Sequence, residues 1–228
     1  MKASFSKVAL LQACQYWARD DVQLVDLSTP RAKKAMERGN RIHALLDEQI
    51  RYGDLSAPCV QDALLDPGGT TFWVRSELAC GIRLSDETAH ILYDVRDRQY
   101  PDGMFCGTAD LVAVGERRLL VCDWKTGRVS LGHLPQVRAL ASVIATALAF
   151  EGQYTVECLV FYIGDDLRQI HHSADILVPS EVSDRFRHLT YLAQRVPDSL
   201  PFAGDHCKSF YCDHRSLCTE FSKNARFR

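Results

Sequence analysis

The chain has no long hydrophobic run and almost no net charge, and each absence excludes a class of protein. Its longest weakly polar stretch, 139–150, is shorter than the roughly 20 residues that a transmembrane helix needs. Serine, lysine and glutamine interrupt the apolar residues of 1–17, which favours an amphipathic helix over a secretory signal peptide. Because the formal net charge is only −2, nucleic acid could be held only through local patches. These features predict a cytoplasmic location.

The chain also lacks internal repeats and low-complexity segments, and its 228 residues predict a single domain, 1–228. The odd number of cysteines, nine, argues against a complete disulfide framework. Five scattered cysteines in apolar surroundings are expected to be small core residues: Cys59, Cys80, Cys106, Cys122 and Cys158. Three others cluster in a polar, aromatic-bearing tail: Cys207, Cys212 and Cys218.

The most informative stretch is 107–127, GTADLVAVGERRLLVCDWKTG, which predicts a β-hairpin. Two apolar runs flank a polar turn whose midpoint falls between Glu116 and Arg117. Folding the strands about that midpoint brings Asp110 directly opposite Asp123. Directly opposed residues point to the same face, about 4.5–5.5 Å apart. Two such carboxylates repel each other, so we expect a positive charge between them, and a hard divalent cation is the natural candidate.

Lys125 shares the face of the two aspartates, because side chains alternate along a strand. The alternative is purely structural, since acid pairs at strand ends and ion-paired lysines are common. The rest of the hairpin is apolar on both faces, which indicates a sheet covered on both sides. One face carries Val112, Val114, Leu119 and Val121; the other carries Leu111, Ala113, Leu120, Cys122 and Trp124. Charges at the mouth of such a sheet favour a metal site.

The other elements predict a mixed α/β sheet with helices on both faces. Helices are expected at 7–20, 30–52, 134–150 and 179–195, and strands at 71–84, 89–92, 154–163 and 168–177. Thr29 and Pro30 suit the N-cap and first position of the second helix. Glycine, proline and aspartate predict a loop at 53–70. The sequence leaves the strand order open.

With these residues in place, the chain resembles the PD-(D/E)XK nuclease superfamily, and within it the RecB-like exonucleases, including the CRISPR-associated and helicase-linked ones. The resemblance covers most of the chain. It implies a restriction-endonuclease-like core, a mixed central β-sheet flanked by helices, with a helical N-terminus and a cysteine-bearing C-terminal tail. Five features carry it in order: Arg38-Gly39-x3-His43, Glu77 in a strand, Gly107-x2-Asp110, Asp123-Trp124-Lys125-Thr126-Gly127, and Gln136.

The resemblance implies that Asp110 and Asp123 hold Mg²⁺ or Mn²⁺ beside the scissile phosphate, with the backbone carbonyl of Trp124 as a further ligand. A nitrogen ligand from His43 would bias the site toward Mn²⁺. Lys125 would orient or deprotonate the attacking water, or stabilise the oxyanion. For His43 the alternative is an ordinary helix-surface histidine.

Glu77 and Gln136 complete the implied catalytic set. Glu77 matches a glutamate that the family has before its central hairpin, although it could also be a solvated strand residue. The family pattern has tyrosine four residues after Gln136, and here that residue is Leu140. This departure weakens a DNA-contact role for the helix and leaves the metal site intact.

The second predicted helix is basic near His43. Its charged residues are Arg31, Lys33, Lys34, Arg38 and Arg41. The ordinary explanation is a solvated face. Their position beside His43 would also let some of them, with Arg38, Arg41 and Lys34 as the candidates, hold backbone phosphates near the metal.

The tail cysteines have three interpretations. In relatives, one cysteine before the nuclease core and three after it hold a [4Fe–4S] cluster, and Cys14, Cys207, Cys212 and Cys218 match that set. The cluster would join 1–28 and 197–228 into one subregion. Relatives place two residues between the first tail cysteines, whereas four stand here. A Zn²⁺ site with His206 and His214 nearby, or unliganded thiols, are the alternatives.

The resemblance therefore implies a metal-dependent DNA exonuclease that acts on single-stranded DNA or DNA with free ends. The setting would be repair, recombination, phage biology or CRISPR adaptation, with protein partners from such a complex and no membrane. One alternative is a non-catalytic DNA-binding or assembly subunit with a structural cluster. A site-specific endonuclease is another, disfavoured because no extra recognition domain is evident.

Overall fold

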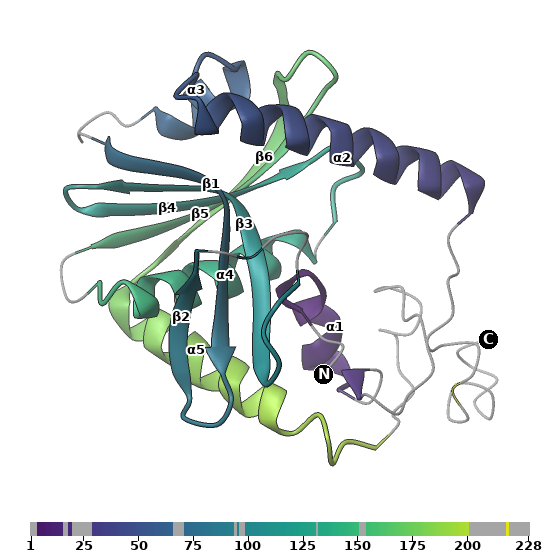
Figure 1. Ribbon diagram of the computed structural model, residues 1–228, viewed down its shortest axis with the longest axis vertical. Coiled ribbons are helices and arrows are strands. Elements are labelled where there is room, and N and C mark those ends of the chain that lie inside the picture. Colours follow the sequence, from purple (N-terminus) through teal and green to yellow (C-terminus); the bar gives the residue numbers. More distant parts are fainter. Residues whose placement is uncertain are drawn as a thin grey trace.

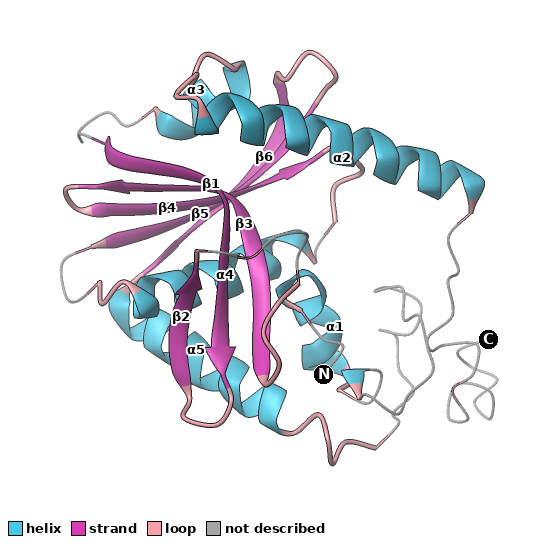
Figure 2. Ribbon diagram, viewed as in Figure 1, coloured by secondary structure: helices cyan, strands magenta, loops and turns pink. Residues whose placement is uncertain are grey.

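The computed structural model consists of one six-stranded sheet between two layers of helices (Figure 1, Figure 2). It describes residues 4–15, 18–19, 29–65, 71–93, 95, 99–130, 132–150, 154–200 and 218. The strand order is β2-β1-β3-β4-β5-β6. The strands are β1 (Thr71–Arg83), β2 (Thr88–Leu92), β3 (Met104–Gly115), β4 (Arg118–Lys125), β5 (Thr155–Ile163) and β6 (Gln169–Leu177). Because β4 and β5 run parallel while the other neighbours run antiparallel, the predicted mixed sheet is confirmed.

The hairpin of β3 and β4 has the predicted register. Leu111 pairs with Cys122 and Val114 pairs with Leu119, and β4 begins directly after a turn at Glu116 and Arg117. The same register, continued by one residue, sets Asp110 opposite Asp123. The pattern of alternating apolar residues and the turn position therefore determined the pairing.

The two faces of the hairpin lie in two separate cores, as predicted. Val112, Leu119 and Val121 belong to the larger core. It is covered by the short 3-10 helix η1 (Phe5–Lys7), α1 (Val8–Ala13), α4 (His133–Ala147) and α5 (Pro179–Gln194). Leu111, Ala113, Leu120, Cys122 and Trp124 belong to the second core, which α2 (Pro30–Arg51) and α3 (Pro58–Leu64) cover. The five scattered cysteines are buried, as expected.

Helix α2 matches its prediction closely. Thr29 Oγ1 accepts a hydrogen bond from the Ala32 N–H at 3.2 Å, and Pro30 occupies the first turn. Ile42, Leu46 and Ile50 recur every four residues and form its buried stripe. This stripe holds the helix against the sheet.

Two local predictions differ from the structure. The predicted loop 53–70 contains α3, which begins with Pro58 and buries Cys59, Val60 and Ala63. So short a helix is stabilised by tertiary burial, which the turn-forming residues around it do not reveal. The helix predicted at 7–20 ends at Ala13, because Cys14 adopts an extended conformation. Within the described residues, no helix combines the length and apolar character needed to cross a membrane.

Candidate metal centre

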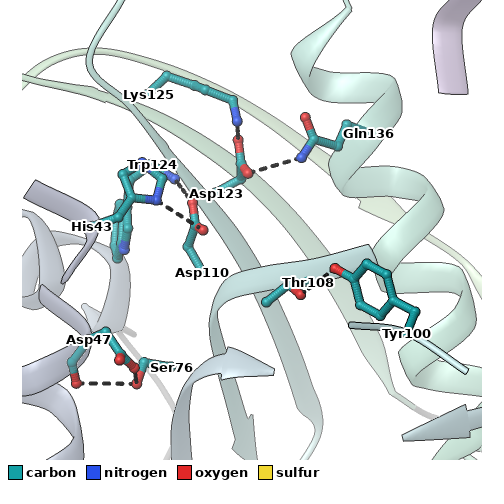
Figure 3. Close-up of polar contacts among 10 residues, drawn as sticks. All are labelled: His43, Asp47, Ser76, Tyr100, Thr108, Asp110, Asp123, Trp124, Lys125 and Gln136. Atoms are coloured by element: carbon teal, nitrogen blue, oxygen red, sulfur yellow. Dashed lines mark hydrogen bonds and ion pairs between the residues drawn. The ribbon is translucent and has the colours of Figure 1, made fainter. Parts of the chain in front are cut away.

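The mouth of the β3–β4 hairpin meets one helix from each layer of the fold (Figure 3). Asp110 on β3 and Asp123 on β4 are 5% and 2% exposed, respectively. His43 approaches from α2, and Gln136 approaches from α4. Buried carboxylates are costly unless they are paired or hold a cation, so these contacts decide the chemistry of the site.

Both oxygens of Asp110 are engaged. Oδ1 lies 3.2 Å from His43 Nδ1, and Oδ2 accepts the Trp124 backbone N–H at 2.7 Å. Burial raises the pKa of Asp110, but the hydrogen bond and charge of His43, with Lys125 and the Trp124 N–H, outweigh it and lower that pKa. Burial likewise lowers the pKa of His43, and Asp110 outweighs it and raises that pKa. Asp110 is therefore the carboxylate of the pair with the lower pKa.

Asp123 is held by a different pair of groups. Its Oδ1 accepts a hydrogen bond from Gln136 Nε2 at 3.2 Å, and its Oδ2 forms an ion pair with the ammonium of Lys125. Burial raises the pKa of Asp123 to about 6; Lys125 opposes this rise and Asp110 adds to it. Two adjacent carboxylates thus have pKa values pushed apart, which is typical of catalytic centres.

Glu77 on β1 completes a group of metal-ligating side chains. Ligand atoms of His43, Glu77 and Asp110 lie within 4.8 Å of one another. Glu77 has a φ of +46°, although Ser76 and Leu78 on either side pair regularly with Leu111 and Ala109 of β3. A left-handed conformation costs a non-glycine residue roughly 1–3 kcal/mol, and such strain is commonly found at functional sites. Two carboxylates and an imidazole suit Mg²⁺ or Mn²⁺.

The Arg38-Gly39-x3-His43 spacing positions α2 over the end of β4. A Cβ atom on Gly39 would lie 3.0 Å from Thr126 Oγ1, so glycine permits the close approach. Arg38 donates from Nη1 to the Thr126 carbonyl at 3.0 Å and from Nε to Asp165 Oδ1 at 2.6 Å. His43, one turn beyond Gly39, then reaches Asp110. The guanidinium of Arg38 is thus engaged with the protein.

The other predicted DNA-contact residues are placed differently. Lys34 and Arg41 are exposed on α2. Gln136 is only 7% exposed and faces Asp123, and Leu140 is buried in the larger core. The structure thus brings Gln136 to the metal centre.

Sequence analysis missed two residues, Ser76 and Asp47, that join β1 to α2 next to Glu77. Ser76 Oγ donates to Asp47 Oδ1 at 2.6 Å (Figure 3). Asp47 also pairs with Arg51 Nε at 2.9 Å. The available signal was the spacing of Asp47, which follows His43 by one helical turn. A further contact joins Tyr100 to Thr108 at 2.8 Å, two residues before Asp110.

The four predicted cluster cysteines are only partly covered by the structure. Cys14 follows α1 and is partly buried, and Cys218 is buried. Cys207 and Cys212, like His206 and His214, lie outside the described residues. The segments that follow α1 and α5 do meet: one pocket is lined by Cys14 together with Asp198 and Leu200.

The chain is similar to known nucleases in sequence. A family model described as the PD-(D/E)XK nuclease superfamily matches residues 2–219. The crystal structure of SSO0001 aligns with a TM-score of 0.41 and 15% sequence identity, over 84% of this chain and 72% of that chain. A search of curated proteins finds no match.

Proposed function

Because the chain belongs to the PD-(D/E)XK nuclease superfamily, we propose that it is a metal-dependent DNA exonuclease of the RecB-like type. The observation that carries the proposal is the group of His43, Glu77 and Asp110, whose ligand atoms lie within 4.8 Å of one another. The ion-paired Asp123 and Lys125 stand beside that group. The substrate would be single-stranded DNA or DNA with free ends, in repair, recombination, phage or CRISPR-adaptation complexes.

His43, Glu77 and Asp110 would hold Mg²⁺ or Mn²⁺, with Asp123 and the Trp124 carbonyl as further oxygen ligands. The donor chemistry fits: carboxylates and a carbonyl suit both ions, and one imidazole favours Mn²⁺. A cation bound there supplies a water of lowered pKa and positive charge beside the phosphate.

The protein groups have separate tasks around that cation. Lys125, ion-paired with Asp123, would orient or deprotonate the attacking water, or stabilise the oxyanion. Gln136 fixes the opposite oxygen of Asp123, and the Trp124 N–H fixes Asp110. Because these donors are buried and already in place, little reorganisation is needed during the reaction.

DNA phosphates would be held close to the centre by α2. Lys34 and Arg41 are exposed on this helix, on the N-terminal side of His43. Arg38, which already binds Thr126 and Asp165, would contribute mainly by positioning α2. A local basic patch suits a chain with a net charge of −2.

The cysteines form the second part of the proposal. Cys14, Cys207, Cys212 and Cys218 would hold a [4Fe–4S] cluster that joins 1–28 to 197–228. The meeting of the segments after α1 and α5 supports this, since Arg19 Nη1 donates to the Ser199 carbonyl at 3.2 Å. Iron and sulfide analysis of anaerobically purified protein tests it; stoichiometric zinc, or no metal in protein with intact thiols, would contradict it.

The nuclease proposal is tested with end-labelled linear and covalently closed circular single-stranded DNA, with and without Mg²⁺ or Mn²⁺. We expect metal-dependent cleavage of the linear strand alone. Asp123→Ala and Lys125→Ala should abolish it, whereas Asp62→Ala, at an exposed position on α3, should not. Cleavage that survives either of these two site substitutions would overturn the mechanism. DNA binding without cleavage by the wild-type protein would favour the non-catalytic subunit, and cleavage of circles would favour an endonuclease.

A further inference from the structure

A polar groove of about 480 Å³ adjoins the metal centre on the α2 side of the sheet. Glu77 lines it, so the groove and the candidate metal site share a residue. Its other polar and aromatic lining residues are Arg51, Arg75, Ser76 and Tyr93. They come from the end of α2, from β1 and from the residue after β2.

The groove has a fixed floor. Ser76 is 8% exposed and donates to Asp47, which also holds Arg51. The hydrogen bond between Ser76 and Asp47 therefore ties β1 to α2 at the groove. This contact holds together two of the elements that line the groove.

Two side chains at the rim remain available to a ligand. Tyr93 is 65% exposed, so its ring can be reached from solvent. Arg75 is exposed, and its guanidinium carbon lies 6.0 Å from the Trp73 ring centroid. Among the described residues, Arg75 makes no ion pair.

A guanidinium and an exposed aromatic ring beside a phosphodiesterase centre suit the binding of a nucleic-acid strand. Arginine binds a backbone phosphate, and an aromatic ring stacks on a base that is free of its complement. In a duplex the bases already stack on one another, so Tyr93 would find no partner. The groove therefore favours a single strand.

We propose that this groove binds single-stranded DNA next to the metal centre, with a base stacked on Tyr93 and a phosphate on Arg75. The proposal rests on the proposed nuclease function, narrows its substrate to a single strand and names the residues that would bind that strand. His43 lies on α2 between the exposed Lys34 and Arg41 on one side and Arg51 on the other. The bound strand would thus pass from the basic half of α2, across the metal centre, into the groove.

The test measures binding of a fluorescein-labelled single-stranded DNA, its duplex, and a single-stranded RNA of the same sequence by anisotropy in Ca²⁺, with oligonucleotide integrity checked afterwards. Tyr93→Ala should weaken single-strand binding about 5- to 150-fold, and Tyr93→Phe should restore it. Arg75→Ala should lower the salt dependence by about 0.7 in log–log slope, and Arg75→Lys should restore it. Duplex affinity should not change with Tyr93.

Matched controls are Tyr191→Ala and Arg187→Ala on α5, which covers the opposite face of the sheet. Neither should change binding. Equal losses for single strand and duplex, tighter binding of RNA than of DNA, or unchanged binding by both groove variants would overturn the proposal.

The outcomes remain separable from those of the nuclease test. If Asp123→Ala loses cleavage while the groove variants bind DNA as the wild type does, the nuclease proposal stands and the groove proposal is wrong. If the wild-type protein cleaves nothing but binds single strands in a way that depends on Tyr93, the groove proposal stands and the nuclease proposal is wrong.

Discussion

Replacing Gln136 with leucine tests whether this amide holds Asp123 or contacts DNA. Gln136 is 7% exposed, and its Nε2 donates to Asp123 Oδ1 at 3.2 Å. Leucine has nearly the same size and lacks the amide group, so a buried carboxylate oxygen loses its hydrogen bond. A hydrogen bond to a charged group contributes about 1.5–3 kcal/mol. Since about 1.4 kcal/mol is a factor of ten, the expected loss in metal affinity is about 10- to 100-fold.

The assay measures cleavage rates of a single strand at saturating DNA over a series of Mg²⁺ and Mn²⁺ concentrations, with DNA binding measured separately in Ca²⁺. Gln136→Leu should need far more metal for half-maximal cleavage, while DNA affinity stays within about twofold of wild type. Gln194→Leu is the matched control, since Gln194 donates to Glu87 on the exposed surface at 2.9 Å. Tenfold weaker DNA binding with unchanged metal affinity would refute the reasoning and return Gln136 to the DNA-contact role implied by the family.

Three further predictions concern stability, measured by urea unfolding of metal-free protein. Glu77→Gly should be about 1 kcal/mol more stable than Glu77→Gln, because glycine accepts a φ of +46° without strain; equal stabilities would contradict this. Ser76→Ala should cost about 1–2 kcal/mol through the lost 2.6 Å bond to Asp47, and wild-type stability would rule that out. Burial, aided by the charge of Lys125, lowers the pKa of His133 from 6.5 to about 4. Between pH 6.5 and pH 4 the unfolded chain therefore binds more protons than the folded chain. Falling pH should then destabilise the wild type relative to His133→Gln by about 1–2 kcal/mol for this half-buried ring. Parallel pH profiles of the free energy of unfolding would disprove this prediction.

The hairpin could be predicted because its signals are local. A period of two residues assigns each side chain to a face, and the turn at Glu116 and Arg117 fixes the register. From these two facts the opposition of Asp110 and Asp123 follows. The division of the hairpin residues between two cores follows from the same alternation.

The rest of the site depends on contacts between elements distant in the sequence. Nothing in the residues around Glu77 indicates its positive φ, because valine, arginine and leucine nearby are ordinary strand residues. The contact between Ser76 and Asp47 requires α2 to cross β1 in one particular alignment. Gln136 could be assigned to Asp123 only once the crossover helix was placed on the sheet.

A single face of α2 makes most of the contacts that place this helix on the sheet. Gly39, His43 and Asp47 follow one another every four residues, and they meet Thr126 after β4, Asp110 on β3 and Ser76 on β1. These three strands are neighbours in that order in the sheet. Four residues advance a helix by about 6 Å, close to the strand spacing of about 4.8 Å, so a helix that crosses the strands contacts one strand with each turn.

This match between helix rise and strand spacing explains why the spacing of residues within α2 says more about its placement on the sheet than any single residue does. Each contact fixes the helix against a different strand, and the two outer contacts set the position of His43 between them. His43 reaches Asp110 between the close approach of Gly39 to Thr126 and the contact of Asp47 with Ser76, the neighbour of Glu77. The candidate metal centre is therefore a consequence of how one helix crosses three strand ends, and its geometry depends on residues that would not touch a metal at all.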